Sequence, residues 1–267
     1  MRIAHTFKTE QTISGYDAKV IVNGISLTIP DGKISVIIGA NACGKSTLLK
    51  TMARLMKPMG GEITLDGKQI GKIPPKQLAR TLGLLPQTPI VPEGITVADL
   101  VGRGRFPHQK ALSGWSKEDY AAVAEAMEIM NITELANHNI DELSGGQRQR
   151  VWIAMALAQQ TDILFLDEPT TFLDITYQVE ILDLLTDLNQ RHHTTIVMVL
   201  HDINLSARYA DYIFAMRKGQ LVAEGMPSEI ITSAIIRDIY GLECVVMEDP
   251  VSRSPLVIPK GRYHAQP

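Results

Sequence analysis

Cysteine is scarce in this sequence of 267 residues, which holds only Cys43 and Cys244. Two cysteines are too few for a disulfide framework, and this favours a reducing compartment. Long apolar runs are also lacking, since none approaches the roughly 18 residues that cross a bilayer. Residues 1–6 lack the apolar core of a secretion signal. We therefore expect a cytosolic protein with no membrane span of its own.

An excess of basic residues is lacking as well. The formal net charge is −3, which argues against a nucleic-acid-binding protein at the level of the whole chain. The length suits one large domain or a core with a subdomain, and a hydrophobic content of 45% is ordinary for a globular protein. We expect no nucleic acid among the partners.

Residues 39–47 fit the phosphate-binding pattern G-x-x-x-x-G-K-[ST]. A β-branched run over 34–38 predicts a buried strand before this loop, and 47–55 predicts a helix after it. Backbone N–H groups and the helix dipole would attract a phosphate there. Lys45 would add a charge for the β- and γ-phosphates, and Ser46 a hydroxyl for Mg²⁺. The alternative, a plain glycine turn with an exposed lysine, fits the flanking strand and helix poorly.

Two residues of this loop carry expectations of their own. Ala42 has a Cβ atom, so we expect its backbone to avoid positive φ. Cys43 lies just before Lys45 and a helix N-terminus, both of which lower the pKa of a thiol. The sequence therefore predicts a reactive thiol that bound nucleotide would cover.

An apolar strand over 163–166 ends in Asp167 and Glu168, which is the Walker B pattern. The aspartate would hold Mg²⁺ and the glutamate would act as general base toward water. Gln87 follows a short strand over 82–85, and its amide could reach a metal or a water or simply face solvent. His201 follows a buried strand over 195–200, the end at which ligands bind in parallel sheets, although a structural role stays open.

The pentapeptide 143–147, Leu-Ser-Gly-Gly-Gln, precedes a helix over 148–160. A serine and two glycines at a helix start predict a second anion site. An ordinary N-cap by Ser144 is an equally good interpretation. The pentapeptide alone does not separate the two.

The rest of the chain alternates strands and helices. We predict antiparallel strands over 2–8 and 19–29 with a turn at 14–17, and a hairpin over 212–224. Residues 96–158 read as a helical insert in an α/β core, with a capping box of Ser116 and Asp119. Tyr120, Val123, Met127 and Met130 form a core stripe there, and Ile175, Val179, Leu182 and Leu185 form one on a later helix.

Together these motifs resemble the nucleotide-binding subunit of an ABC transporter over residues 2–245. The pentapeptide discriminates, because kinases and GTPases share the phosphate loop and lack it. The resemblance implies an α/β fold: a P-loop NTPase core with an N-terminal antiparallel β subdomain and an inserted α-helical subdomain at about 88–158. One ABC ATPase domain would cover 1–245, and 246–267 would be a C-terminal tail.

The resemblance also implies a homodimer with two ATP molecules between the subunits. Each ATP would contact Lys45 and Ser46 of one chain and Ser144 and Gly146 of the other, while Asp174 crosses the interface. Tyr16 would stack on adenine, Gln87 would link the site to the helical insert, and His201 would contact the γ-phosphate. The implied nucleotide-binding set is Tyr16, Gly39, Ala40, Asn41, Ala42, Cys43, Gly44, Lys45, Ser46, Thr47, Ser144, Gly145, Gly146, Gln147 and Asp174. The implied Mg²⁺ ligands are Ser46, Gln87 and Asp167, and the implied catalytic residues are Lys45, Gln87, Glu168 and His201.

A finer resemblance concerns the cargo. Residues 103–109, the Ala42-Cys43 pair, and residues 208–211 and 223–225 are similar to the importer branch for iron(III) siderophores, haem and cobalamin. This implies a separate integral-membrane permease, an extracytoplasmic binding protein, and a place on the cytoplasmic face of the membrane. Charge reversal at Arg103 or Arg105 should then reduce transport more than hydrolysis, unless these arginines only solvate a loop.

Three functions remain open at this point. The first is an ATP-hydrolysing subunit of an importer for an iron(III) siderophore or a related chelate, with haem or cobalamin as alternative cargo. The second is a soluble ABC ATPase acting outside transport, which usually has two cassettes or a long coiled-coil insertion. The third is a nucleotide-gated scaffold, which the intact Lys45, Asp167, Glu168 and His201 disfavour.

Overall fold

The computed structural model describes residues 3–87, 93–109 and 114–261, so the predicted start of the helical insert at 88 lies outside the described residues. The chain forms two compact units. We call residues 5–71 with 197–267 the phosphate-loop unit, and residues 1–4 with 72–196 the helical unit. Among the described residues, no helix is both long and apolar enough to cross a membrane.

An antiparallel sheet of order β2-β1-β4-β5 opens the phosphate-loop unit. Its strands are β1 (Phe7–Tyr16), β2 (Lys19–Ile29), β4 (Gly60–Leu65) and β5 (Lys68–Gln69). The predicted first strand and its turn at 14–17 are wrong, because β1 continues to Tyr16 and the turn lies at Asp17 and Ala18. Gly15 permits this extension, since a Cβ atom there would lie 1.9 Å from the Lys19 carbonyl oxygen of β2.

A second sheet of this unit positions the phosphate loop. Strand β3 (Ile34–Gly39) is buried along its whole length and pairs in parallel with β9 (Tyr212–Arg217), with Gly39 opposite Met216. β10 (Gln220–Gly225) pairs antiparallel with β9, as the predicted hairpin requires, and β8 (Thr195–Val199) follows β3 in the strand order. Helix α1 (Lys45–Met52) begins directly after the loop. The predicted succession of strand, loop and helix is therefore confirmed.

The C-terminal part of the phosphate-loop unit is ordered into short elements. They are α7 (Ile203–Tyr209), α8 (Pro227–Ile230), α9 (Ser233–Tyr240), β11 (Cys244–Glu248) and β12 (Pro255–Pro259). The last two form a separate antiparallel hairpin, with Cys244 opposite Pro259. Asn204 of α7 holds this hairpin: its side-chain oxygen accepts from the Val257 N–H at 2.8 Å, and its amide nitrogen donates to the Val257 carbonyl at 3.3 Å.

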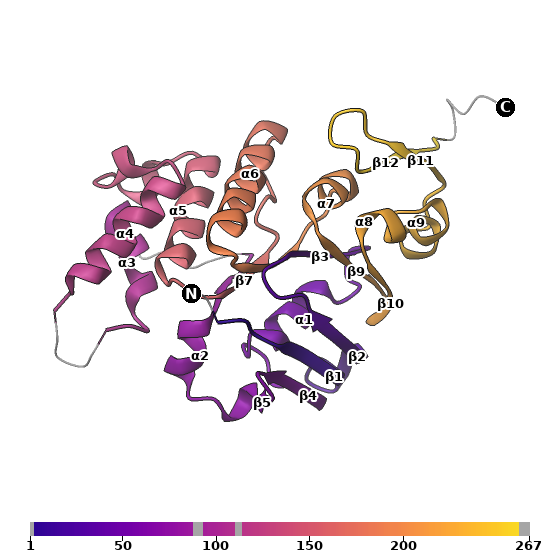
Figure 1. Cartoon of the computed structure of the whole chain (residues 1–267), viewed down its shortest axis with the longest axis horizontal. Helices are drawn as coiled ribbons and strands as arrows, with labels where there is room; N and C mark the ends of the chain where they lie inside the picture. The colour runs from indigo at the N-terminus through magenta and orange to yellow at the C-terminus, as the bar shows by residue number, and fades with distance from the viewer. Residues whose placement is uncertain (1–2, 88–92, 110–113, 262–267) are drawn as a thin grey trace. The chain divides into compact units, whose positions relative to one another are not determined.

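The helical unit contains α2 (Pro75–Thr81), α3 (Val97–Gly102), α4 (Lys117–Ile129), α5 (Gly145–Ala158) and α6 (Ile175–His192), with η1 (Ile70–Lys72) at its boundary. Three further 3₁₀ turns are η2 (Arg103–Arg105), η3 (Thr133–Leu135) and η4 (Ile140–Glu142). Strands β6 (Leu82–Leu85) and β7 (Ile163–Asp167) pair in parallel. Helices α3, α4 and α5 pack on one another (Figure 1).

The predicted core stripes of this unit are only partly right. Val123, Met127 and Met130 are buried, and the capping box of Ser116 and Asp119 is present. Tyr120 is 63% exposed and lies against the Trp115 ring. On α6, Ile175 is exposed as well, and the buried residues are Ile181, Leu182, Leu185 and Leu188. Ile175 is the first residue of α6 and precedes the buried part of that helix.

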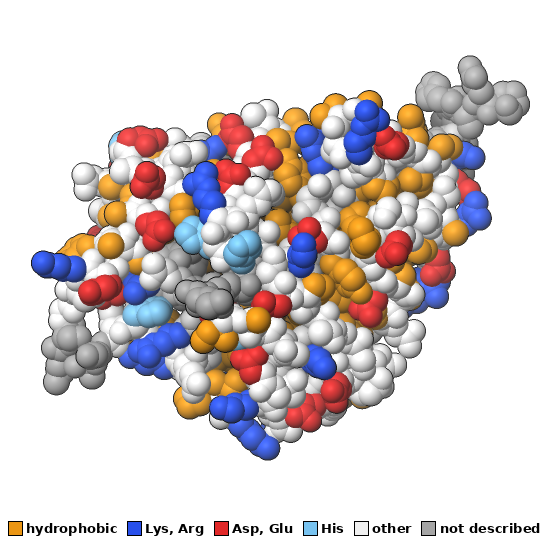
Figure 2. Space-filling model, in the orientation of Figure 1, with side chains coloured by type: hydrophobic (Ala, Val, Ile, Leu, Met, Phe, Trp, Pro, Cys, Tyr) orange, Lys and Arg blue, Asp and Glu red, His pale blue; other side chains and the backbone are white. Residues whose placement is uncertain are grey.

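The surface carries both signs of charge. Figure 2 shows acidic and basic side chains interspersed over the face that it presents. This distribution agrees with the net charge of −3. The visible face offers no broad basic patch of the kind that binds nucleic acid.

Candidate active site

The phosphate loop joins β3 to α1 and depends on two glycines with unusual backbones. Gly39 has φ 153° and Gly44, the N-cap of α1, has φ 106°. A Cβ atom on Gly39 would lie 2.4 Å from the Met216 carbonyl oxygen and 2.7 Å from Cys43 Sγ. Larger residues are therefore excluded at the start of the loop, and the glycine of the motif has a packing reason as well as a conformational one.

Lys45 lies inside the loop rather than in solvent. It is 5% exposed, and its ammonium donates to the carbonyl oxygens of Gly39 at 2.7 Å and Ala40 at 3.2 Å. A buried ammonium needs acceptors, and these carbonyls supply them. Phosphate oxygens can replace the same carbonyls without moving the charge far, so the structure holds Lys45 where the motif needs it. The interpretation of the loop as a turn with an exposed lysine is thus wrong.

Two expectations about the loop fail. Ala42 has φ 61°, so it does occupy the left-handed region that we expected it to avoid. The Cys43 N–H donates to the Ala40 carbonyl at 3.2 Å and the Cys43 carbonyl accepts from the Gly219 N–H at 2.9 Å, and these bonds offset the cost of about 1–2 kcal/mol for a Cβ atom at this φ. Cys43 is 6% exposed, and burial raises the pKa of its thiol more than the nearby Lys45 lowers it. The expected lowering of the thiol pKa is therefore wrong, because desolvation outweighs the neighbouring positive charge.

In the helical unit, the carboxylate of Glu168 is held in place by two donors. The Gln87 side-chain amide donates to Glu168 Oε2 at 2.6 Å, and the Thr171 hydroxyl donates to the same oxygen at 2.9 Å. Glu168 also has φ 57°, a backbone conformation that costs free energy in a residue with a side chain. Asp167, at the end of β7, is 2% exposed. The end of β7 therefore presents two acids, one buried and one fixed by a glutamine from the loop after β6.

Ser144 caps helix α5 through a complete capping box. Its hydroxyl accepts from the Gln147 N–H at 3.3 Å, and its own N–H donates to Gln147 Oε1 at 3.0 Å. The N-cap interpretation is confirmed, and it leaves the anion interpretation open because a cap and an anion site use different N–H groups. Gly146 lets α5 pass close to α6, since a Cβ atom there would lie 3.0 Å from the Tyr177 ring.

The remaining predicted residues lie at the ends of elements. Asp174 is the N-cap of α6 and accepts from the Tyr177 N–H at 3.2 Å. Tyr16 is the last residue of β1 and is 52% exposed. His201 follows β8 and is exposed, just before Asp202 caps α7. These positions leave the Tyr16 ring and the His201 ring accessible to a ligand.

The structure divides the predicted residues between its units. Tyr16, residues 39–47 and His201 belong to the phosphate-loop unit. Gln87, residues 144–147, Asp167, Glu168 and Asp174 belong to the helical unit. Among the described residues, no group of three or more His, Cys, Asp or Glu side chains could hold a metal ion.

Two contacts near the predicted motifs do not follow from the sequence: the bond from Gly39 to Tyr240 and the burial of Arg105. The Tyr240 hydroxyl accepts from the Gly39 N–H at 2.9 Å, although 201 positions separate them. Arg105 is buried, donating to Asp119 at 2.8 Å and to the Ala158 carbonyl at 2.7 Å. Arg103 is exposed, so the two arginines that we treated alike have different surroundings. No local pattern around Tyr240 or Arg105 signals these contacts.

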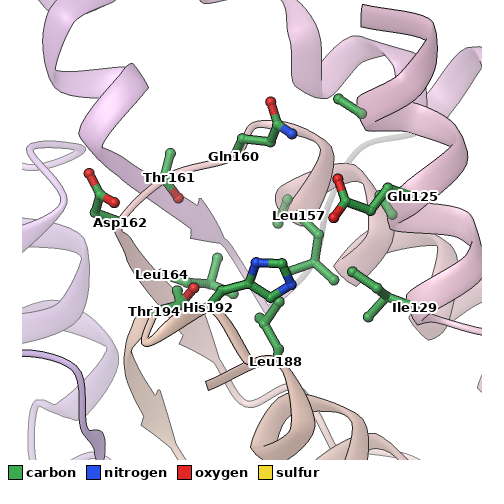
Figure 3. A pocket seen from close by; sticks show the side chains of 13 residues that line it. Glu125, Ile129, Leu157, Gln160, Thr161, Asp162, Leu164, Leu188, His192 and Thr194 are labelled. Carbon is green, nitrogen blue, oxygen red and sulfur yellow. The ribbon is translucent and has the colours of Figure 1, made fainter. Parts of the chain in front are cut away.

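A pocket of about 230 Å³ lies in the helical unit, and of the Walker B segment only the strand residue Leu164 lines it, not Asp167 or Glu168. Its walls come from α4, α5, the segment after α5 and the end of α6, and Figure 3 shows His192 and Glu125 among the side chains around it. The pocket mixes apolar side chains with a few polar ones. It offers no glycine loop and no lysine for phosphate, so we place the candidate active site at the motifs.

Known proteins resemble this chain along most of its length. A family model described as ABC transporter matches residues 22–171. The ferric enterobactin transport ATP-binding protein FepC of Escherichia coli (strain K12) is 50% identical over 95% of this chain and 93% of its own. The petrobactin import ATP-binding protein FpuD of Bacillus anthracis is 48% identical over 96% of this chain and 93% of its own.

Solved structures agree with this. A dimeric structure of MJ0796, described as a bacterial ABC transporter cassette, has a TM-score of 0.72 and is 29% identical, covering 82% of this chain and 98% of that one. A second dimeric structure of MJ0796, bound to ADP and Pi, has a TM-score of 0.71. These likenesses confirm the predicted fold class, a P-loop NTPase core with an antiparallel β subdomain and helical parts.

Proposed function

The chain belongs to the ABC transporter family and is an ABC-type ATPase, and from this premise we propose that it powers the import of an iron(III) siderophore. The names of FepC and FpuD, two relatives at about half identity over nearly the whole chain, support a ferric siderophore as cargo. The resemblance of residues 103–109 to the same branch supports it independently of the catalytic motifs. Haem and cobalamin are the competing cargoes.

We assign nucleotide binding to the phosphate loop and its surroundings. The loop N–H groups at the start of α1 would bind the phosphates, and Lys45 would exchange its bonds to the Gly39 and Ala40 carbonyls for phosphate oxygens. Tyr16, exposed at the end of β1, would stack on the adenine ring. Ser144 and Gly146 would contact the nucleotide of a second subunit, with Asp174 crossing the same interface.

We propose that a magnesium ion binds together with the nucleotide. Mg²⁺ prefers oxygen ligands and is usually held by one or two carboxylates together with waters and substrate phosphates, so it does not need a cluster of three acids. Ser46, Gln87 and Asp167 supply a hydroxyl, an amide and a carboxylate oxygen, and they are the ligands we propose. When bound, the ion would neutralise charge on the β- and γ-phosphates.

Hydrolysis would use Glu168 as the general base. Gln87 and Thr171 both donate to Glu168 Oε2, and these two bonds would hold the carboxylate in one orientation while it accepts a proton from water. Gln87 would hold the base as well as contact the ion. His201 would contact the γ-phosphate from the exposed end of β8.

The proposed assembly is a homodimer of this chain on the cytoplasmic face of the membrane, docked on a separate permease that receives cargo from an extracytoplasmic binding protein. The dimeric MJ0796 structures support the first part. A two-fold contact would be isologous, with both subunits contributing the same residues. We also propose the domain division of an ATPase domain over 1–245, with its helical part at about 88–158, and a tail over 246–267.

The held carboxylate of Glu168 is the observation that carries the hydrolysis part of this proposal, and uptake is the test of the cargo. A deletion strain would receive a plasmid with the wild-type gene or the Glu168→Gln variant. Growth under iron limitation would then be measured with one ferric siderophore, haem or another chelate at a time. Rescue of growth on a ferric siderophore by wild type alone supports the proposal. Normal growth of the deletion strain on every ferric siderophore, with no redundant ATPase present, contradicts it.

A further inference from the structure

Tyr240 connects the C-terminal helix α9 to the first residue of the phosphate loop. Its hydroxyl accepts from the Gly39 N–H at 2.9 Å. Tyr240 is the last residue of α9, and Gly39 is the last residue of β3, so the contact lies where the strand gives way to the loop. The bond therefore fixes the orientation of the peptide from which the loop departs.

Gly39 is restrained on its other side as well. Its carbonyl accepts from the Lys45 ammonium at 2.7 Å, and there is no room for a Cβ atom between Met216 and Cys43. When a phosphate draws Lys45 away, the carbonyl bond is the one that changes. The Tyr240 bond to the N–H then remains as a restraint on this residue, together with its pairing opposite Met216 of β9.

The surroundings of Tyr240 keep its hydroxyl neutral. Burial raises the pKa of this phenol to about 12, with Cys43 adding to the rise and the Gly39 N–H opposing it. The group is therefore an uncharged acceptor at physiological pH. A neutral acceptor satisfies the Gly39 N–H without placing negative charge beside a loop that must bind phosphates.

The C-terminal segment that carries Tyr240 is itself fastened to the phosphate-loop unit. Arg217 of β9 forms an ion pair with Asp238 of α9, and Gly241 ends α9 in the left-handed conformation. Farther on, the hydrogen bonds between Asn204 and Val257 tie β12 to α7, the helix that begins just after His201. The same segment thus contacts the start of the phosphate loop and the helix behind His201.

We propose that Tyr240 is a positioning residue for the phosphate loop, through which the C-terminal segment sets the affinity for ATP. The inference rests on the proposed nucleotide site at this loop and adds a residue that the motifs do not contain. Without the hydroxyl, the Gly39 peptide loses its acceptor and the loop samples orientations in which its N–H groups do not converge on a phosphate. Binding weakens, whereas the groups that act on water are untouched.

The test compares Tyr240→Phe with a matched control, Tyr212→Phe. Tyr212 lies on β9, in the same sheet as Gly39, and it pairs with Ser35 at the opposite end of β3 from the phosphate loop. ATP affinity of the purified full chain would be measured by equilibrium binding, and kcat and KM by phosphate release. The loss of one hydrogen bond of ordinary strength predicts that Tyr240→Phe binds ATP about three- to tenfold more weakly and that its KM rises by the same factor. The control and the kcat of both variants should stay within about twofold of wild type.

Hydrogen exchange provides a second measurement that does not depend on turnover. Peptides covering residues 34–44 should exchange faster in Tyr240→Phe than in wild type or Tyr212→Phe, and ATP should restore their protection. Unchanged KM and exchange, a loss in kcat alone, or equal effects in both variants would overturn the proposal. If the proposed function itself were wrong, the wild-type protein would bind no ATP. That result is distinguishable from a wild type that binds ATP and a Tyr240→Phe variant that behaves like it.

Discussion

The Gln87 amide nitrogen lies 2.6 Å from Glu168 Oε2, which connects the loop after β6 to the end of β7. The two residues are 81 positions apart, and each belongs to a separate motif. This bond gives Gln87 a task that does not require metal contact. It also explains how Glu168 can keep one orientation despite the strained backbone at φ 57°.

Gln87→Ala removes the donor and should lower kcat for ATP hydrolysis by about tenfold, since a general base that is not positioned loses part of a contribution of roughly 10²–10⁴. KM for ATP should change by less than about threefold. Gln190→Ala, an exposed glutamine on α6, is the matched control and should behave as wild type. A Gln87→Ala variant with wild-type kcat would show that Thr171 alone positions the carboxylate.

Ala42→Gly should stabilise the protein or leave it unchanged. Ala42 has φ 61°, and glycine relieves a strain of about 1–2 kcal/mol while adding about 0.4–1 kcal/mol of unfolded-state entropy. Ala40→Gly gains no such relief, because Ala40 is not among the residues at positive φ. Urea denaturation of the two variants measures the difference. A larger loss of stability in Ala42→Gly than in Ala40→Gly would contradict the argument.

Asp119→Asn should destabilise the helical unit by about 3 kcal/mol at pH 7, because it leaves the buried Arg105 guanidinium without its counter-charge. Arg105 and the Ser116 cap hold the pKa of the Asp119 carboxyl below its usual value of 3.8. A carboxyl group whose pKa is lowered by folding stabilises the fold at pH values above its pKa in the unfolded chain. This stabilisation is lost as the pH falls through its pKa in the folded protein. The difference between variant and wild type should thus be constant from pH 7 to about 5 and shrink below about 4. A difference that grows in acid would contradict this.

Charge reversal should separate the two arginines of residues 103–109. Arg105→Glu places a carboxylate beside Asp119 in a buried site, and it should prevent stable folding. Arg103 is exposed, so Arg103→Glu should fold normally and keep its basal ATP hydrolysis. If this region contacts the permease, uptake of the ferric siderophore should fall while hydrolysis does not. Thermal melting, phosphate release and uptake assays on both variants test this, and normal uptake by Arg103→Glu would show that the residue only faces solvent.

The sequence predicts local features well and distant contacts poorly. The strand before the phosphate loop and the helix after it follow from a β-branched run, a glycine loop and helical periodicity within about 20 residues. The burial of Arg105 depends on Asp119 and on a carbonyl of α5, and a charged residue in a loop gives no sign of that. Cys43 shows the limit most clearly, because charge lowers the pKa of its thiol while burial raises it more, and only the structure reveals the burial.

The backbone conformations of the site were also predictable only where local sequence determines them. Gly39 and Gly44 belong to the predicted glycine loop, and both have positive φ values that glycine adopts without a steric penalty. Ala42 and Glu168 adopt positive φ although each has a side chain, because surrounding contacts outweigh the local cost. The hydrogen bond between Tyr240 and Gly39 could not be predicted, because the segment around Tyr240 contains no recognisable motif.

ATP turnover by Glu168→Gln tests the central claim most directly. Glutamine keeps the shape of the side chain and can still accept from Gln87, but it cannot take a proton from water. Phosphate release in the presence of Mg²⁺ and ATP should therefore fall by at least about a hundredfold, while ATP binding is kept and a dimer accumulates in gel filtration. Turnover within a fewfold of wild type, or loss of ATP binding together with turnover, would contradict the assignment of Glu168 as the general base.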